Sequence, residues 1–245
     1  MAEQHAEQYS DFSKMIDHSL LMPTLDQQQL AEGCKLAVAY DVASVCILPY
    51  FLRKCSELLS GSSVQPSTTI GFPHGGHTTY AKQCEAERAI EDGCQELDMV
   101  INISQALSQN WDYVANEIHA IVSLAHTAER KVKVIFENCY LQDEHKIRLC
   151  NICTDIGADW VKTSTGYGTG GATLEDLQLM LRHVGPGVQV KAAGGVRDFE
   201  SLQRVRALGV TRCGASATQK MMDQARAALG LEPIEFDITS AASGY

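Results

Sequence analysis

The chain has 245 residues, of which 45% are hydrophobic and 20% are charged, and its formal net charge is −10. This balance is typical of a globular protein with one large domain or two small ones. The negative charge argues against nucleic acid or an anionic membrane as the main partner, and no apolar run approaches the roughly 20 residues that a membrane-spanning helix needs.

Short β-rich runs alternate with helical patterns from residue 14 onward. Most of the runs are apolar and β-branched, as expected of parallel strands that are buried on both faces. The predicted strands cover residues 14–21, 42–48, 67–72, 96–103, 131–137, 159–164, 188–194 and 211–216. Eight such units favour a (β/α)8 TIM barrel, with a doubly wound open sheet as the structural alternative. We therefore expect one α/β barrel domain over residues 1–245, with a polar N-terminal segment over about 1–12 and a C-terminal tail over about 232–245.

Two helical segments show their apolar faces clearly. The apolar positions of residues 111–126 are Val114, Ile118, Ile121 and Ala125. Those of residues 173–185 are Leu174, Leu177, Leu181 and Val184. In the second segment, Thr173 and Asp176 predict a capping box at the start, and Gly185 predicts the end.

The cysteines and the N-terminus indicate a cytoplasmic protein. Nine cysteines, an odd number, are scattered through apolar segments, which fits free buried thiols better than a disulfide framework. Cys150 and Cys153 form a CxxC inside a helical pattern, where two buried thiols are a better interpretation than a redox or metal site. The start of the chain, "MAEQHAEQYSDFSK", is polar and has no secretory signal.

Two lysines occur late in predicted buried strands. Lys162 follows Trp160 and Val161, and Lys191 lies in the next strand at a similar height. Two ammonium groups so placed disfavour each other's charge and lower at least one pKa. A neutral lysine is a nucleophile that forms Schiff bases with carbonyl compounds. The alternative is that each lysine is held in an ion pair. Lys131 and Lys133 come at the start of their strand, near the opposite rim of the barrel.

Three carboxylates are predicted at the same mouth of the barrel. They are Asp17 on the first strand, Asp98 on the fourth and Glu137 at the end of the fifth. A Schiff-base enzyme needs a group that moves protons, and Asp98 is the best candidate for it. A buried ion pair without catalysis is an equally good interpretation of each acid taken singly.

Glycine-rich loops follow the seventh and eighth predicted strands. The first contains Gly194, Gly195 and Arg197, and the second contains Gly214 and Ser216 before a helix near residue 217. Glycine lets backbone N–H groups approach an anion, and TIM barrels bind phosphate at these loops. Tight turns without a ligand are the alternative.

Two further patterns suggest other chemistry only weakly. Gly166, Gly168 and Gly171 match a GxGxxG dinucleotide fingerprint, but no acidic residue follows about twenty residues later. His74 and His77 could bind a metal, although no close Cys, Asp or Glu ligands accompany them. We therefore expect no metal.

The motifs "MIDHSLL", "FPHGG", "ELDMVIN", "VKTSTG", "KAAGGVR" and "GAS" resemble those of the deoxyribose-phosphate aldolases, a family of class I aldolases. The resemblance runs in order from about residue 14 to 229. It implies a (β/α)8 barrel that reversibly cleaves 2-deoxy-D-ribose 5-phosphate to D-glyceraldehyde 3-phosphate and acetaldehyde, in deoxyribose phosphate catabolism. It also implies that no cofactor is needed.

The resemblance also implies roles for particular residues. Lys162 matches the Schiff-base lysine, and Lys191 matches the second lysine that perturbs it. Asp98 matches the carboxylate of the proton relay, and Asp17 matches an acid that holds the lysine network. Tyr245 resembles a C-terminal tyrosine that assists proton transfer in some members.

The same resemblance implies the ligand pocket. The residues that match its phosphate-binding region are Gly166, Gly194, Gly195, Val196, Arg197, Gly214 and Ser216. Cys46 matches a cysteine near the aldehyde. The chain departs from some members at Ala192, at Asn138 and at Ala217, where a second serine is replaced.

The expected partner is a small phosphorylated sugar or aldehyde, and a homodimer is expected only because barrels of this kind commonly form one. Two other functions stay open. One is a different Schiff-base or acyl-transfer enzyme on the same barrel, and the other is a catalytically silent sugar-phosphate sensor.

Overall fold

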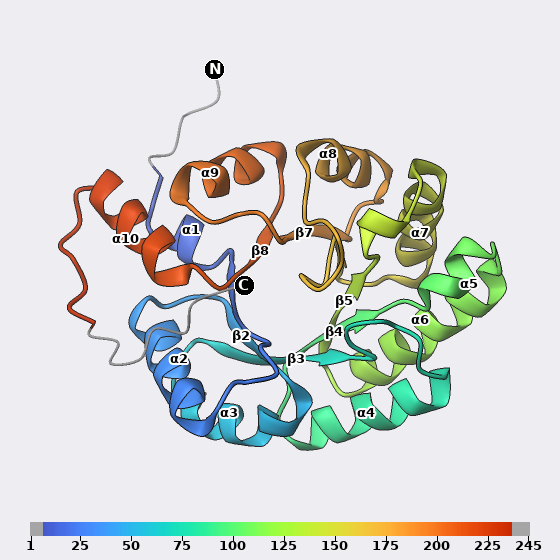
Figure 1. The fold of residues 1–245 in the computed structure, drawn as a ribbon, viewed down its shortest axis with the longest axis horizontal. Helices are drawn as coiled ribbons and strands as arrows, with labels where there is room; N and C mark the ends of the chain where they lie inside the picture. Colours follow the sequence, from blue (N-terminus) through green and yellow to red (C-terminus); the bar gives the residue numbers. More distant parts are fainter. Residues whose placement is uncertain (1–6, 237–245) are drawn as a thin grey trace.

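The computed structural model describes residues 7–236, and its strands form a closed parallel barrel with the helices around the outside (Figure 1). The strands pair in chain order, and β8 pairs with β1. Their bounds are β1 Ile16–Leu20, β2 Ser44–Ile47, β3 Gln65–Ile70, β4 Glu96–Val100, β5 Lys131–Ile135, β6 Trp160–Lys162, β7 Gln189–Ala193 and β8 Arg212–Ala215. Closure confirms the predicted (β/α)8 barrel and excludes the open sheet.

The helices lie between the strands along the chain, except that α1 precedes β1 and α10 follows β8. The α-helices are α1 Ser10–Ser13, α2 Gln27–Ala39, α3 Leu52–Leu59, α4 Thr79–Glu91, α5 Ile103–Leu107, α6 Trp111–Thr127, α7 Asp143–Ile156, α8 Leu174–His183, α9 Phe199–Leu208 and α10 Thr218–Ala228. Two short 3-10 helices, η1 Pro49–Phe51 and η2 Asn138–Tyr140, follow β2 and β5.

Side chains alternate along each strand between the hydrophobic core and the inside of the barrel. In β4, Leu97 and Met99 are fully buried in the core, whereas Glu96 and Asp98 make ion pairs inside the barrel. The strand register then decides which inward residues meet. It places Lys162 beside Lys191, as predicted.

The predicted helix faces are confirmed in α6 and only partly in α8. In α6, all four predicted apolar residues are buried. In α8, Leu174 is 43% exposed, so its prediction was wrong, because the buried face begins one turn later at Leu177 and Met180. The Thr173 side chain caps the helix by accepting the N–H of Asp176.

Both ends of the described chain contact the core. Phe12 is fully buried and packs edge-to-face on Phe199, with ring centroids 4.8 Å apart. Near the other end, Ile234 and Phe236 are partly buried against the same core. Tyr245 lies outside the described residues.

All nine cysteines lie in the described part of the chain and are free. Seven are buried, including Cys150 and Cys153 inside α7, as expected. Cys84 and Cys139 are exposed, so the prediction of buried thiols was wrong for these two.

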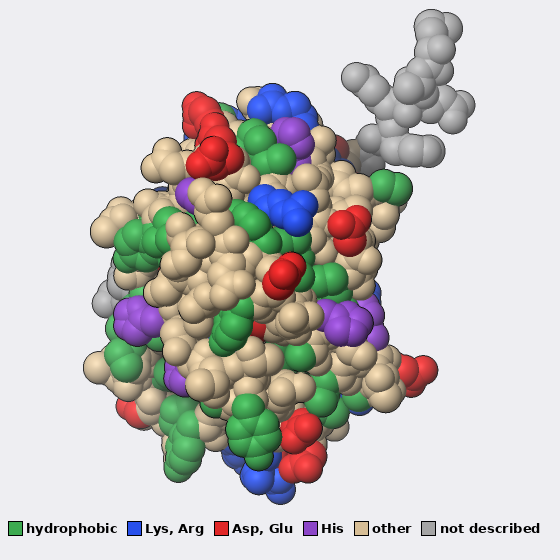
Figure 2. Space-filling model, turned by 90° about the vertical axis from the view of Figure 1, so that its right-hand side faces the viewer, with side chains coloured by type: hydrophobic (Ala, Val, Ile, Leu, Met, Phe, Trp, Pro, Cys, Tyr) green, Lys and Arg blue, Asp and Glu red, His purple; other side chains and the backbone are tan. Residues whose placement is uncertain are grey.

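No described helix combines the length and the apolar character needed to cross a bilayer. On the molecular face drawn in Figure 2, the acidic and basic side chains are interspersed.

A fully buried ion pair joins α4 to α6 beside the barrel. The Lys82 Nζ lies 2.7 Å from a carboxylate oxygen of Glu117 and donates a hydrogen bond to the carbonyl of Val100. Glu117 also accepts the N–H of Asn102. The pair therefore fixes two helices to the end of β4.

Replacing Lys82 with methionine is expected to lower the free energy of unfolding by about 3–5 kcal/mol, because it leaves the Glu117 carboxylate buried without its cation. The matched control is Lys54→Met, which removes a lysine from an exposed pair with Glu57 and should cost less than about 1 kcal/mol. Urea unfolding measures both values. Equal losses in the two variants would contradict this account of the buried pair.

Candidate active site

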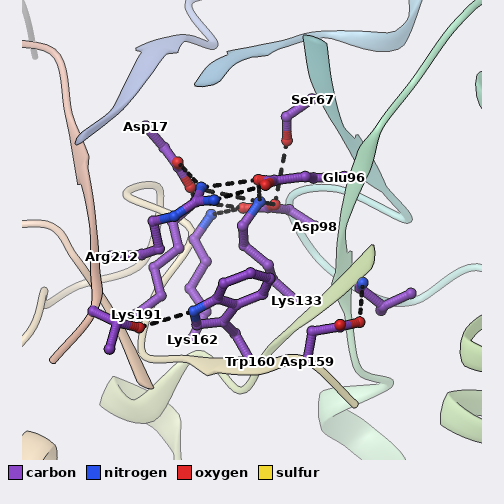
Figure 3. Close-up of polar contacts among 12 residues, drawn as sticks. Asp17, Ser67, Glu96, Asp98, Lys133, Asp159, Trp160, Lys162, Lys191 and Arg212 are labelled. Atoms are coloured by element: carbon purple, nitrogen blue, oxygen red, sulfur yellow. Dashed lines mark hydrogen bonds and ion pairs between the residues drawn. The ribbon is translucent and has the colours of Figure 1, made fainter. Parts of the chain in front are cut away.

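Seven charged side chains meet inside the described barrel (Figure 3). Six strands supply them, and six of the seven side chains are at most 4% exposed. They are Asp17, Glu96, Asp98, Lys133, Lys162, Lys191 and Arg212.

Asp98 links the two predicted lysines directly. One of its carboxylate oxygens, Oδ2, lies 2.7 Å from the Nζ of Lys162 and 2.8 Å from the Nζ of Lys191. Lys191 also contacts Asp17, at 2.5 Å. Lys162 thus shares the oxygen of a single carboxylate, whereas Lys191 contacts two carboxylates.

A second layer of charges lies next to this group. The Nζ of Lys133 lies 2.5 Å from Glu96 and 2.9 Å from Oδ1 of Asp98. Arg212 donates to both carboxylate oxygens of Glu96 and to Asp17. The Trp160 ring lies against this layer, 4.9 Å from the Arg212 guanidinium and 5.7 Å from the Lys133 Nζ.

Four basic groups in this cluster face three carboxylates, so full ionisation would leave one positive charge without a partner. An unpaired buried charge is costly, and a lysine avoids the cost by losing its proton. Arginine does not lose its proton in proteins. One of the three lysines is therefore expected to be neutral.

Among the three lysines, Lys162 is the one whose pKa is lowered. Burial lowers the pKa of Lys162 below its ordinary value, and the charge of Lys191 lowers it further against the opposing effect of Asp98. For Lys191, burial is outweighed by Asp17 and Asp98, which raise its pKa. For Lys133, three carboxylates likewise outweigh burial and raise the pKa. Mutual repulsion, predicted as the cause, contributes less at Lys162 than burial does.

A pocket opens from Lys162 toward the loops that follow β7 and β8. It is lined by Lys162, Lys191 and Asp17 together with all eight residues that the resemblance places near the ligand. Those eight are Cys46, Gly166, Gly194, Gly195, Val196, Arg197, Gly214 and Ser216. The pocket thus runs from the buried amine to the glycine-rich loops.

Gly194 needs to be glycine for two reasons. Its φ is +78°, in the left-handed region that side chains disfavour, and a Cβ there would lie 2.9 Å from the Cα of Gly171. The loop after β6 therefore packs directly on the loop after β7, and the N–H of Ala172 donates to the carbonyls of Ala193 and Gly194.

Glu137, the third predicted carboxylate, has a different setting. It is buried, and its hydrogen bonds go to the backbone N–H and the hydroxyl of Thr165, which lines the pocket. Burial raises its pKa. Glu137 therefore holds the loop that carries Gly166 and makes no ion pair with a lysine in the described structure.

Comparison with known proteins places the chain in a family. Residues 12–218 match the DeoC/LacD family of aldolases. The chain belongs to this family.

Individual relatives agree with this assignment. The chain is 65% identical to a deoxyribose-phosphate aldolase of Rhodopirellula baltica over 97% of its own length and 98% of the relative's. Among solved structures, an aldolase called QR15 superposes with a TM-score of 0.85 at 34% identity, covering 91% of this chain and 99% of the other. A tetrameric deoxyribose phosphate aldolase from Aeropyrum pernix gives 0.83 at 29%, covering 90% and 93%.

In this aldolase, the structure brings together Lys162, Lys191, Asp98 and Asp17, as the sequence predicted. It gives no support to a metal site at the two histidines or to a dinucleotide site at the GxGxxG glycines. His74 and His77 are both exposed, and no cluster of three or more possible metal ligands occurs within residues 7–236. The GxGxxG glycines lie in the loop between β6 and α8, and only the first of them lines the pocket.

Sequence reasoning missed Lys133, Glu96 and Arg212. Lys133 was placed near the rim, but it is fully buried, because its side chain points into the barrel beside Asp98. The signal was the period of two along the strands. Glu96 comes two residues before Asp98, and Arg212 comes two before Gly214, so each shares the inward face.

Proposed function

We propose that the protein is a class I aldolase that reversibly cleaves 2-deoxy-D-ribose 5-phosphate to D-glyceraldehyde 3-phosphate and acetaldehyde. The observation that carries the proposal is the setting of Lys162. Its amine is buried, hydrogen-bonded to Asp98, lowered in pKa, and open to a pocket with glycine-rich loops at its other end. The 65% identity to a deoxyribose-phosphate aldolase supports the same substrate.

The reaction begins when the neutral Lys162 amine attacks C1 of the open-chain aldehyde and forms a carbinolamine. Asp98, 2.7 Å from the Lys162 Nζ, is placed to pass protons through water as hydroxide leaves and an iminium forms. The C3 hydroxyl then loses its proton, and the C2–C3 bond breaks to release D-glyceraldehyde 3-phosphate. The electron pair of that bond moves to the iminium and gives an enamine. Protonation at carbon and hydrolysis release acetaldehyde and restore the amine.

The phosphate group is proposed to bind at the far end of the pocket. Left-handed glycines such as Gly194 and Gly195 let neighbouring backbone N–H groups converge on an anion. The N-terminus of α10, which begins two residues after Ser216, also favours negative charge. Ala217 offers its backbone there but no hydroxyl.

A cleavage assay tests the proposal. Release of acetaldehyde is expected from 2-deoxy-D-ribose 5-phosphate, with a kcat/KM at least about 100-fold above that for unphosphorylated 2-deoxy-D-ribose, since charge-assisted hydrogen bonds are worth about 1.5–3 kcal/mol each. The rate should be unchanged after treatment with a chelator. Binding without cleavage would indicate a sensor, and loss of activity with the chelator would indicate a metal-dependent reaction.

We also propose a cytoplasmic, single-domain enzyme that acts in deoxyribose phosphate catabolism, is assembled as a homodimer and binds no nucleic acid. Nine free cysteines support a reducing compartment, and one closed barrel supports a single domain. A role for Tyr245 in proton transfer stays a prediction, as does cofactor-free catalysis.

A further inference from the structure

Further charged side chains lie beyond those that contact Lys162 directly. Lys133 and Glu96 are both inside the barrel, yet neither lines the pocket. Lys133 reaches Lys162 only through Asp98, because it holds Oδ1 of that carboxylate while Lys162 holds Oδ2. Glu96 in turn holds Lys133, at 2.5 Å, and Arg212, at 2.7 Å.

The charge of this second layer decides how many protons the whole cluster keeps. Three carboxylates balance the charges of Lys133, Lys191 and Arg212, which leaves none for Lys162. Removing one cation from the second layer would leave a carboxylate charge unbalanced, and Lys162 could balance it only by taking up a proton. Removing one carboxylate would have the opposite effect.

We propose that Lys133 and Glu96 are positioning residues that set the charge state of the Lys162 amine without touching the substrate. This inference rests on the proposed role of Lys162 as the nucleophile. It assigns to the second layer a function beyond stability, because the sign of each charge determines the pH range in which the aldolase is active.

Charged and titratable groups from several elements surround Lys162. They are Asp98 on β4, Lys191 on β7, Cys46 on β2, Asp17 on β1 and Glu137 after β5. The proposed variants leave all of them in place. Any change in the pH dependence therefore comes from the second layer.

The test is the pH dependence of kcat/KM for cleavage, whose acidic limb reports the essential base of the free enzyme. In Lys133→Met, Lys162 should bind its proton more tightly, so the acidic limb should move to higher pH by about one unit. In Glu96→Gln, it should move to lower pH by about one unit, for the opposite reason. The double variant Lys133→Met with Glu96→Gln restores the charge balance, and its limb should return toward that of the unmodified enzyme.

Opposite shifts that cancel in the double variant would support the proposal. A purely structural role would be shown by reduced rates with an unmoved limb, or by limbs that move in the same direction, and either result would overturn it. If Lys133→Met does not fold, Glu96→Gln and the double variant still give a definite answer. The unmodified enzyme is assayed first, so absence of cleavage there would refute the proposed function and not this inference.

Discussion

Replacing Lys162 with methionine is expected to lower kcat for cleavage of 2-deoxy-D-ribose 5-phosphate by a factor of about 10⁴ or more, because no other neutral amine takes its place. The other two lysines of the cluster have raised pKa values and contact two or more carboxylates each. They therefore stay protonated and cannot substitute as nucleophiles. The measurement is kcat from steady-state release of acetaldehyde.

The variant should remain folded, because Lys162 is the lysine whose charge the cluster does not need. Methionine is similar in length and suits a buried position. The matched control is Lys54→Met, the same chemical change on a side chain that is 60% exposed, and it should leave kcat unchanged. A Lys162→Met protein that is folded and retains more than about a tenth of the activity would contradict the assignment, since loss of a nucleophile costs far more.

The second large effect is expected at Asp98. Asp98→Asn should lower kcat by about 10²–10⁴, the usual contribution of general acid–base catalysis. Its carboxylate is the group in contact with the Lys162 Nζ. Burial alone would raise its pKa, but the charges of neighbouring lysines, Lys133 and Lys191 among them, outweigh burial and hold the pKa well below its ordinary value. The carboxylate is therefore ionised, and its contact with the Lys162 Nζ places it beside any proton that is released there.

A matched variant distinguishes the loss of proton transfer by Asp98 from the loss of one negative charge in the cluster. Asp17→Asn removes the same charge from the same cluster, but Asp17 contacts Lys191, Lys133 and Arg212 and not Lys162. We expect its kcat to fall at least about tenfold less than that of Asp98→Asn, because only Asp98 reaches the reacting amine. Equal losses in the two variants would mean that Asp98 acts only through charge balance.

The strands could be predicted from the sequence because each is a short, β-branched run between helical patterns. The pairing of Lys162 with Lys191 followed from their equal height on neighbouring strands, and the register confirms it. Closure of the sheet followed from the number of units. These features depend on local pattern and on a small set of allowed topologies.

The second layer of charges was not predicted, for a physical reason. Lys133 is the third residue of β5, and position along a strand does not show how far a long side chain reaches. Its burial depends on partners from other strands, Glu96 and Asp98 among them. The position of Phe12 against Phe199 similarly depends on a contact between segments far apart in the chain.

The conformation and contacts of Glu137 could not be predicted from the sequence either. Its backbone has a φ of +59°, an unusual conformation for a residue other than glycine. That conformation accompanies a carboxylate turned toward Thr165, whereas the strand pattern alone aims it at the lysines. Loop geometry of this kind depends on packing between segments that the strand pattern does not show.

The central claim is that Lys162 is the amine that reacts. It is tested most directly by incubating the protein with acetaldehyde, reducing with borohydride and locating the modified residue by peptide mass spectrometry. The account predicts a reduced two-carbon adduct on Lys162 and none in Lys162→Met. An adduct on Lys191 or Lys133 instead, or no adduct in a protein that cleaves the substrate, would contradict it.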